Sequence, residues 1–271
     1  MASRRKVALP SASSVGIGQT ASFDLATNRR YFFIGLVYKT NAAQATIEAD
    51  ITEIRLLING KVQRRFSAAD LNKINAMNGQ AFVAGLIPIH LSEPWRRTLE
   101  GEEGLAWGMA DVASFKIEVD ISGAAVAPTL SGIAEVDNVQ IPLGLIVKWR
   151  KQTFTATGAQ VVTITTLTKN DAYSRLHCFS ALVTNALVTL DQLERYNATL
   201  ALNAALLARQ KLVQQANTYS IVFDDDQQVT SAIAMKDLRT GAQLISEFRI
   251  DLTFSGAGSC VVLSEAVGYA D

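Results

Sequence analysis

The sequence predicts an all-β protein made of two tandem jelly rolls, each with eight strands and an inserted helix. Short runs of alternating or β-branched apolar residues are separated by turn signals, which is typical of β-sandwiches. A pattern at residues 115–124 recurs at residues 248–257. All five prolines lie at or before position 142, so the composition changes near mid-chain. These observations favour a duplicated sandwich.

The chain is expected to begin with an arm and continue into strands. Residues 1–18 hold Ser, Ala, Gly and Pro without a period, and we interpret them as an N-terminal arm. Strands are predicted over Thr20–Leu25, which alternates, and Tyr31–Tyr38, which is rich in aromatic and β-branched residues. Asn59-Gly60 lies between two further apolar runs and predicts a tight hairpin, because both residues tolerate positive φ.

A helix is predicted to begin at Ser67. Ser67 and Asp70 have the spacing of a capping box with a carboxylate at its third position, and Asn78-Gly79 is a typical helix end. Strands are then predicted on both sides of an excursion at residues 92–110, over Phe82–Leu91 and Ser114–Ile121.

Residues 122–143 are rich in small residues and contain Pro128 and Pro142, so we interpret them as a linker. The predicted organisation is an arm at 1–18, a first jelly roll at 19–138 and a second at 139–271.

The second half is expected to repeat the plan of the first. A helix is predicted from about Ala198 to Gln215, with Asn197 as its cap. Ile233–Leu238 is ambiguous between strand and short helix. Strands are predicted over Leu145–Trp149, Thr153–Ala156, Val161–Leu167, Leu176–Val183, Ala186–Leu190, Thr218–Phe223, Glu247–Phe254 and Ser259–Leu263.

Two landmarks carry the internal repeat. FKIEVDISGA at 115–124 matches FRIDLTFSGA at 248–257 in Phe, Ile, Ser, Gly and Ala, with similar pairs between them. Arg65–Ala68 corresponds to Arg195–Ala198, where an aromatic residue precedes a predicted helix cap in both copies. The two landmarks occur in the same order at nearly the same offset, so we infer a duplication.

The composition excludes several classes of protein. Lys plus Arg and Asp plus Glu are 25 each, with 49% apolar and 18% charged residues. A neutral chain favours association and is unlike a broadly basic nucleic-acid-binding domain, so no sequence-specific nucleic acid is expected. No apolar run reaches the length of a membrane-spanning helix, and no apolar signal segment follows the basic start Arg4-Arg5-Lys6.

No residue is assigned a catalytic or cofactor-binding role. Cys178 and Cys260 lie in predicted strands and are expected to be free thiols in the core. His177 is adjacent to Cys178 and would face the other side of its strand, so the two make a poor nucleophile–base pair. The spacing needed for a zinc site is missing.

Two other segments are candidate ligand sites with weak support. Asp224-Asp225-Asp226 carries the oxygen ligands that calcium prefers, but consecutive residues on an extended chain point in opposite directions. A solvated turn and a calcium site at a subunit contact both remain open, and no metal ligand set is assigned. Gly16–Ala21 fits a dinucleotide pattern, yet a strand follows it instead of a helix, which favours a flexible arm.

The excursion combines acidic residues with tryptophans. Glu102, Glu103 and Trp107 are the donors that a glycan-acting site would need, since glycosidases place two carboxylates across a sugar. The simpler interpretation is a solvated loop, Glu100 included. Trp95 and Trp107 either plug the end of the first sandwich or anchor a neighbouring subunit.

Five segments resemble, in order and spacing, the double jelly-roll major capsid proteins of icosahedral DNA bacteriophages with an internal membrane. The likeness is to the short corticovirus type, related to the tectivirus lineage, and extends over nearly the whole chain. The segments are Ile54–Ile74, Phe115–Ala134, Asn217–Phe223, Met235–Leu238 and Glu247–Gly256.

The resemblance implies a non-catalytic subunit of the virion shell, assembled in the host cytoplasm. It implies homotrimers whose six jelly rolls form a pseudo-hexagonal capsomer, and contacts with neighbouring trimers and with penton or spike proteins. It also implies contact of the basic residues Arg4–Lys6 with the internal membrane, although a solvated chain start is the simpler interpretation. Some relatives bind calcium, with no ligands assignable here. The alternatives are a carbohydrate-binding, adhesive β-sandwich like a viral spike, and a two-domain glycan-acting enzyme.

Overall fold

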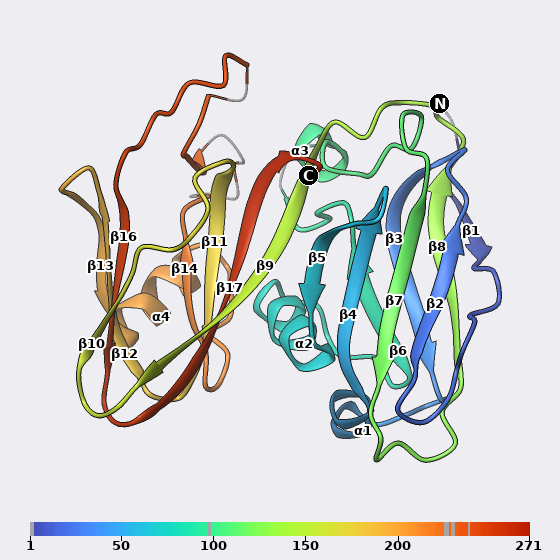
Figure 1. The fold of residues 1–271 in the computed structure, drawn as a ribbon, viewed down its shortest axis with the longest axis horizontal. Helices are drawn as coiled ribbons and strands as arrows, with labels where there is room; N and C mark the ends of the chain where they lie inside the picture. The colour runs from blue at the N-terminus through green and yellow to red at the C-terminus, as the bar shows by residue number, and fades with distance from the viewer. Residues whose placement is uncertain (1–2, 97–98, 225–227, 229–230, 238) are drawn as a thin grey trace. The chain divides into compact units, whose positions relative to one another are not determined.

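The computed structural model describes residues 3–96, 99–224, 228, 231–237 and 239–271 (Figure 1). Contacts divide the chain into two compact units. Unit 1 comprises Met1–Ala76, Gln80–Lys148 and Tyr269–Asp271, and unit 2 comprises Met77–Gly79 and Trp149–Gly268. No helix in the described part of the chain is long and apolar enough to cross a membrane.

Unit 1 is a sandwich of two antiparallel layers. One layer has the strand order β1-β8-β3-β6, and the other has the order β5-β4-β7-β2. Its strands are β1 (Arg5–Ala8), β2 (Thr20–Leu25), β3 (Arg30–Tyr38), β4 (Ile51–Ile58), β5 (Lys61–Phe66), β6 (Leu86–His90), β7 (Phe115–Ile121) and β8 (Leu130–Asp137). Its helices are α1 (Gln44–Asp50), α2 (Ala68–Met77) and α3 (Leu99–Glu103).

Unit 2 has the same two-layer plan. One layer has the order β10-β16-β12-β13, the other has the order β9-β17-β11-β14, and the short β15 pairs with β11. Its strands are β9 (Leu145–Ala156) from Trp149 on, β10 (Val161–Ile164), β11 (Ala172–Phe179), β12 (Val183–Leu190), β13 (Leu193–Thr199), β14 (Tyr219–Val222), β15 (Ile233–Ala234), β16 (Phe248–Phe254) and β17 (Gly258–Tyr269) up to Gly268, with helix α4 (Leu200–Arg209). The proposed boundary between residues 138 and 139 lies in the segment between β8 and β9.

The sheet orders confirm the predicted duplication. If β1 to β8 are matched in chain order with β9 to β14, β16 and β17, the layer β1-β8-β3-β6 corresponds to β9-β17-β11-β14. The layer β5-β4-β7-β2 likewise corresponds to β13-β12-β16-β10. A helix follows the fifth strand in both units, as α2 and α4. The repeated pattern in the sequence is therefore one strand, β7 in unit 1 and β16 in unit 2.

Local signals set the hairpin and the first long helix as predicted. Asn59 and Gly60 have φ angles of 50° and 79° and join β4 to β5. At the start of α2, the backbone N–H of Asp70 donates to Ser67 Oγ at 3.1 Å. The backbone N–H of Ser67 donates in return to Asp70 Oδ2 at 2.9 Å, which completes the capping box.

Several predictions of local structure are wrong. Residues 130–137, interpreted as part of a linker, form β8, which pairs with both β1 and β3. Within the expected arm, Arg5–Ala8 form β1, so this part of the arm belongs to a sheet. The segment Leu176–Val183 is not one strand, because a turn separates β11 from β12.

The second long helix also differs from its prediction. Asn197 lies in β13, and α4 begins at Leu200 after Thr199, whose side chain accepts a hydrogen bond from the backbone N–H of Leu202. An Ala- and Leu-rich run does not by itself define where a helix begins, and threonine is also a favoured N-cap residue, although a weaker one than asparagine.

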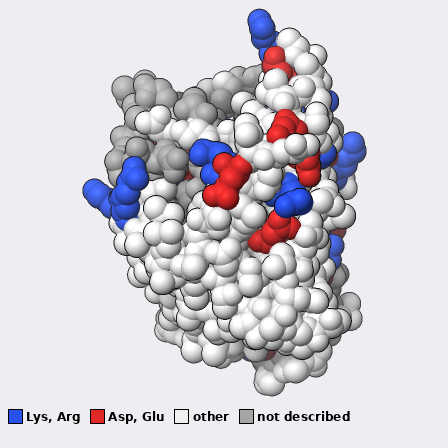
Figure 2. Space-filling view, turned by 90° about the vertical axis from the view of Figure 1, so that its left-hand side faces the viewer, with Lys and Arg blue, Asp and Glu red and all other residues white. Residues whose placement is uncertain are grey.

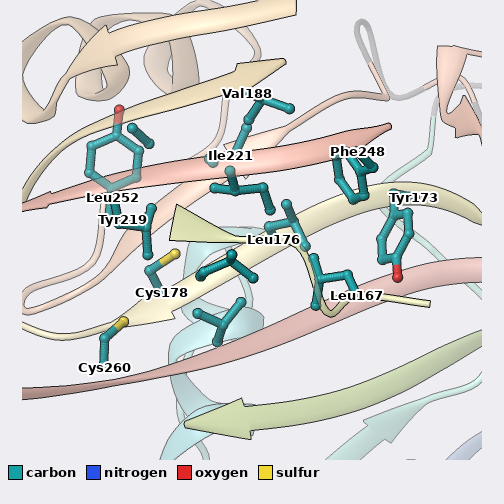
Figure 3. Close-up of a cluster of buried hydrophobic side chains, with 14 of the residues drawn as sticks. Leu167, Tyr173, Leu176, Cys178, Val188, Tyr219, Ile221, Phe248, Leu252 and Cys260 are labelled. Carbon is teal, nitrogen blue, oxygen red and sulfur yellow. The ribbon is translucent and has the colours of Figure 1, made fainter. Parts of the chain in front are cut away.

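Each unit encloses its own core. In unit 1 the Trp107 side chain is fully buried against Phe115, with ring centroids 5.5 Å apart, and Tyr31 packs edge-on against the same Phe115. Of the two interpretations of this tryptophan, a plug of the first sandwich is confirmed. Figure 3 shows the core of unit 2, which contains Leu176, Phe248 and Tyr219 from three strands, with Leu176 between the other two in this view.

Candidate assembly surfaces

The two cysteines are core residues, as predicted. Cys178 and Cys260 are free, buried thiols on β11 and β17 (Figure 3). A hydrogen bond with Cys260, together with burial, raises the pKa of Cys178 well above its ordinary value. A thiol with a raised pKa is not a thiolate nucleophile at neutral pH.

A serine, a histidine and a glutamate lie in line across three neighbouring strands of unit 2. His177 Nδ1 is 2.9 Å from Ser220 Oγ, and His177 Nε2 is 2.9 Å from Glu265 Oε1. The spacing is that of a nucleophile, base and acid, but all three residues are 1–3% exposed, so a substrate has no access to the serine. Sequence reasoning missed Ser220 and Glu265 because strand pairing alone brings them to His177.

The aspartate run does not offer three free carboxylates. Asp224 is fully buried and binds the guanidinium of Arg175, with Nε to Oδ1 at 3.0 Å. Asp225 and Asp226 lie outside the described residues. Within the described ranges, no three His, Cys, Asp or Glu residues are grouped as metal ligands.

The acidic excursion is not arranged as a glycan site in unit 1. Trp107 is fully buried and presents no platform for a sugar. Glu103 is engaged by Arg4 at 2.5 Å and by Arg30 at 3.7 Å. The side chain of Glu100 is outside the described part of the structure. Trp95 is partly buried and lies edge-on to His90.

The basic start of the chain is partly neutralised within unit 1. Arg4 binds Glu103 and Glu135, and its guanidinium lies 4.1 Å from the ring centroid of Phe32. Arg5 donates to the side chain of Asn138 at 2.7 Å, whereas Lys6 is exposed. The predicted pattern Gly16–Ala21 leads into β2 and has no helix after it, so it lacks the geometry of a dinucleotide site.

One outer face of unit 1 carries an ion-pair network. Arg55 on β4 contacts Glu53 at 2.6 Å, Asp120 at 2.7 Å and Glu118 at 3.0 Å, and Arg65 also binds Glu53 at 2.7 Å. These hydrogen bonds, chiefly those with Asp120, raise the pKa of Arg55. Burial alone would raise the pKa of Asp120, but hydrogen bonds from Arg55 and Thr20 outweigh it and lower that pKa.

The equivalent positions on the matching face of unit 2 are mostly uncharged. In unit 1, Arg55 lies opposite Glu118 and Arg65; in unit 2, Leu187 lies opposite Asp251 and Asn197. The pair Glu53 and Asp120 is likewise replaced by Asn185 and Thr253. Of these five positions only Asp251 is charged in unit 2, and Arg249 pairs with it at 3.0 Å.

Figure 2 shows this side of unit 2, where β10, β12, β13 and β16 lie. Charged side chains gather in the upper part of the view, and a broad lower area carries almost none. Long stretches of unit 2, which include buried as well as exposed residues, contain no Asp, Glu, Lys or Arg: 152–168, 176–190, 196–208, 212–223 and 252–264. Such surface is inexpensive to remove from water and is typical of protein–protein contacts.

An exposed apolar loop in unit 1 was not anticipated. The sequence prediction placed Phe82 in a strand that continues to Leu91, but β6 begins only at Leu86. Ala81, Phe82, Val83 and Ala84 are all exposed, with Phe82 at 36% and Val83 at 51%. In the sequence, a hydrophobic run of this kind predicts a strand. Whether the run is buried or exposed depends on the path of the folded chain, which the run itself does not encode.

Solved structures that match this fold include major capsid proteins of viruses. The major capsid protein P2 from bacteriophage PM2 matches with a TM-score of 0.89 and 20% identity, covering 99% of this chain and 98% of that chain. The STIV MCP matches with a TM-score of 0.69 and 10% identity, covering 98% and 97%. PBCV-1 VP54, as fitted into a reconstruction of the virophage Sputnik, matches with a TM-score of 0.68 and 11% identity, covering 99% and 97%. No curated protein sequence matched the chain.

The fold, two jelly rolls of equal sheet order in one chain, defines the class of double jelly-roll capsid proteins. The N-terminal domain of the viral coat protein P2 family matches residues 6–137, and the C-terminal domain of that family matches residues 146–269. The chain therefore belongs to the viral coat protein P2 family. It is a structural, non-enzymatic protein of the virion capsid, which assembles with copies of itself.

Proposed function

We propose that three copies of this coat protein close into a ring, and that the ring is a pseudo-hexagonal capsomer of an icosahedral shell over an internal membrane. The observation that carries the proposal is the equal strand order of the two units. Two similar units per chain give six per trimer, so a threefold ring offers six similar sides for packing in a shell.

The chemistry of the surface supports an assembling subunit. The net charge is zero, and unit 2 carries long stretches without Asp, Glu, Lys or Arg. Closed rings of three copies need a large contact between two different surfaces of the chain. Burying a neutral surface in such a contact costs little free energy, because few charges are removed from water.

The absolute mass in solution tests the proposal. The chain has a mass of 29.2 kDa, and light scattering at micromolar concentration should give three times that mass. The same measurement with a calcium chelator tests the calcium requirement, and loss of the trimer would support it. A monomer at all concentrations would contradict the proposed function.

The internal membrane is the second proposed partner. Lys6 on β1 is exposed, whereas Arg4 is neutralised by Glu103 and Glu135, so β1 offers less free charge than its sequence suggests. Sedimentation of the protein with anionic vesicles should fall in a Lys6→Glu variant. If this variant binds vesicles as well as the wild type does, the membrane contact lies on another surface. Penton and spike proteins remain proposed partners of the assembled shell.

A further inference from the structure

The apolar loop of unit 1 is held in a defined position. It spans Ala81–Ala84, here called the Phe82 knob, and lies in the segment between α2 and β6. At its end, the backbone N–H of Gly85 donates to Ala42 O at 2.9 Å, and the N–H of Leu86 donates to Val83 O at 3.0 Å. Gly85 has a φ of 77°, and a side chain there would lie 2.8 Å from the backbone nitrogen of Asn41. The knob is therefore anchored.

Four consecutive exposed apolar residues are unfavourable for a chain that stays alone in water. Such runs are expected only where they serve a contact. The whole stretch 74–92 has no Asp, Glu, Lys or Arg, so no charge of the loop or its flanks needs to be removed from water when the knob is covered.

Unit 2 contains an uncharged groove with both apolar and polar lining, here called the Ala216 groove. It has a volume of about 320 Å³ and none of its lining residues is charged. The β11–β12 turn, the start of α4 and the segment before β14 supply the lining: Ser180, Ala181, Val183, Leu200 and residues 214–218. Its wall is fixed by hydrogen bonds, since Leu182 N–H donates to Ser180 Oγ and Ser255 N–H donates to Leu182 O.

We propose that the Phe82 knob of one copy inserts into the Ala216 groove of a second copy of this chain. The occupant is a second copy because a coat protein packs against itself, and a ring of three requires two different surfaces that fit each other. The knob is convex and apolar, the groove is concave and uncharged, and each belongs to a different unit. The inference rests on the proposed trimer and names the contact that closes it.

Single substitutions test each side of the contact. Phe82→Asp puts a charge on the knob, and Ala216→Asp puts one in the groove; both positions are exposed, so the fold should tolerate them. We expect both variants to be monomers by light scattering at a concentration where the wild type is a trimer. Val126→Asp in unit 1 and Leu193→Asp in unit 2 are matched controls, because Val126 and Leu193 are about 75% exposed and outside both surfaces. The controls should remain trimers, and circular dichroism should be the same for all five proteins.

Mixing the two monomeric variants gives the sharper test. The Phe82→Asp chain retains a groove and the Ala216→Asp chain retains a knob, so one intact contact can form between them. The mixture should therefore contain dimers of twice 29.2 kDa that cannot close into a ring. A substitution that simply damages the fold would not give this rescue.

The outcomes separate the contact from the trimer. A wild-type trimer that Phe82→Asp leaves intact overturns the contact and leaves the proposed function standing. A mixture without dimers also overturns the contact. A wild type that forms another oligomer, lost in both variants and recovered as dimers in the mixture, supports the contact and overturns the trimer. A wild type that is monomeric throughout overturns both.

Discussion

The two units share one strand order but differ in charge at matched positions of one outer face. Arg55 in unit 1 is part of a network with three carboxylates, whereas Leu187 occupies the equivalent place in unit 2. The inward positions differ much less: Phe115 and Phe248 are both 2% exposed. The comparison teaches that a jelly roll is specified by its inward face, which leaves the outer face free to be charged in one copy and neutral in the other.

The largest expected effect tests whether the matched core positions are energetically equal. Phe115→Ala and Phe248→Ala should each lower the free energy of unfolding by about 3–5 kcal/mol, because each leaves a cavity in a closed core. Phe66→Ala, at a fully buried position of unit 1, should fall in the same range.

Urea unfolding followed by circular dichroism measures these losses. Labelling of Cys178 and Cys260 reports on unit 2, which holds both thiols, and should be faster in Phe248→Ala. If either Phe115→Ala or Phe248→Ala unfolds like the wild type, the two cores are not energetically equivalent at this position.

The next effect concerns a histidine of unit 1. Burial, together with the charge of Arg64, lowers the pKa of His90 from 6.5 to about 4. As the pH falls, His90 therefore becomes protonated in the unfolded chain before it does so in the folded chain. The free energy of unfolding is unaffected by His90 above pH 6.5, and it decreases progressively between pH 6.5 and 4, by at most about 3 kcal/mol.

His90→Gln is the matched variant, because glutamine does not titrate in this range. Urea unfolding at several pH values between 7.5 and 4 should show a smaller loss of stability for the variant than for the wild type. Parallel pH profiles for the two proteins would contradict the lowered pKa of His90.

The smallest effects come from exchanging the residues of the two outer faces. Arg55→Leu should cost about 1–2 kcal/mol, because it leaves Glu53, Glu118 and Asp120 close together without their cation. High salt should reduce this cost, since it screens the repulsion between the carboxylates. Leu187→Arg should change the stability by less than about 0.5 kcal/mol, because Asp251 lies opposite.

Thermal unfolding at low and high salt measures both variants. Equal losses for the two exchanges, or a loss for Arg55→Leu that does not depend on salt, would show that the network is not the source of the difference between the faces.

The strands that the sequence missed have a common cause. β8 begins with Leu130, Ser131 and Gly132, and β1 contains Arg5 and Lys6, so neither segment has the composition of an isolated strand. Both are strands because each pairs with the other and β8 also pairs with β3. Pairing with distant segments can therefore make a strand of a segment whose own sequence has no periodic signal.

For the candidate surfaces too, some features could be recognised from the sequence and others only from the structure. Neutral composition and the repeat could be recognised from the sequence, and they indicated an assembling, duplicated protein. The Phe82 knob could not, because an apolar run such as Ala81–Ala84 has the pattern of a buried strand. The Ala216 groove could not either, since its lining comes from three separate segments.

The sequence by itself determined the hairpin at Asn59-Gly60, the capping box at Ser67 and the recurring strand, because each depends on interactions between residues close in the chain or on a periodic burial pattern. Only the tertiary structure decided that β1 and β8 are strands, that Trp107 plugs unit 1, and that Phe82 is exposed. The physical reason is that burial and strand pairing depend on which distant segments meet, and this is settled when the two layers of each sandwich close on each other.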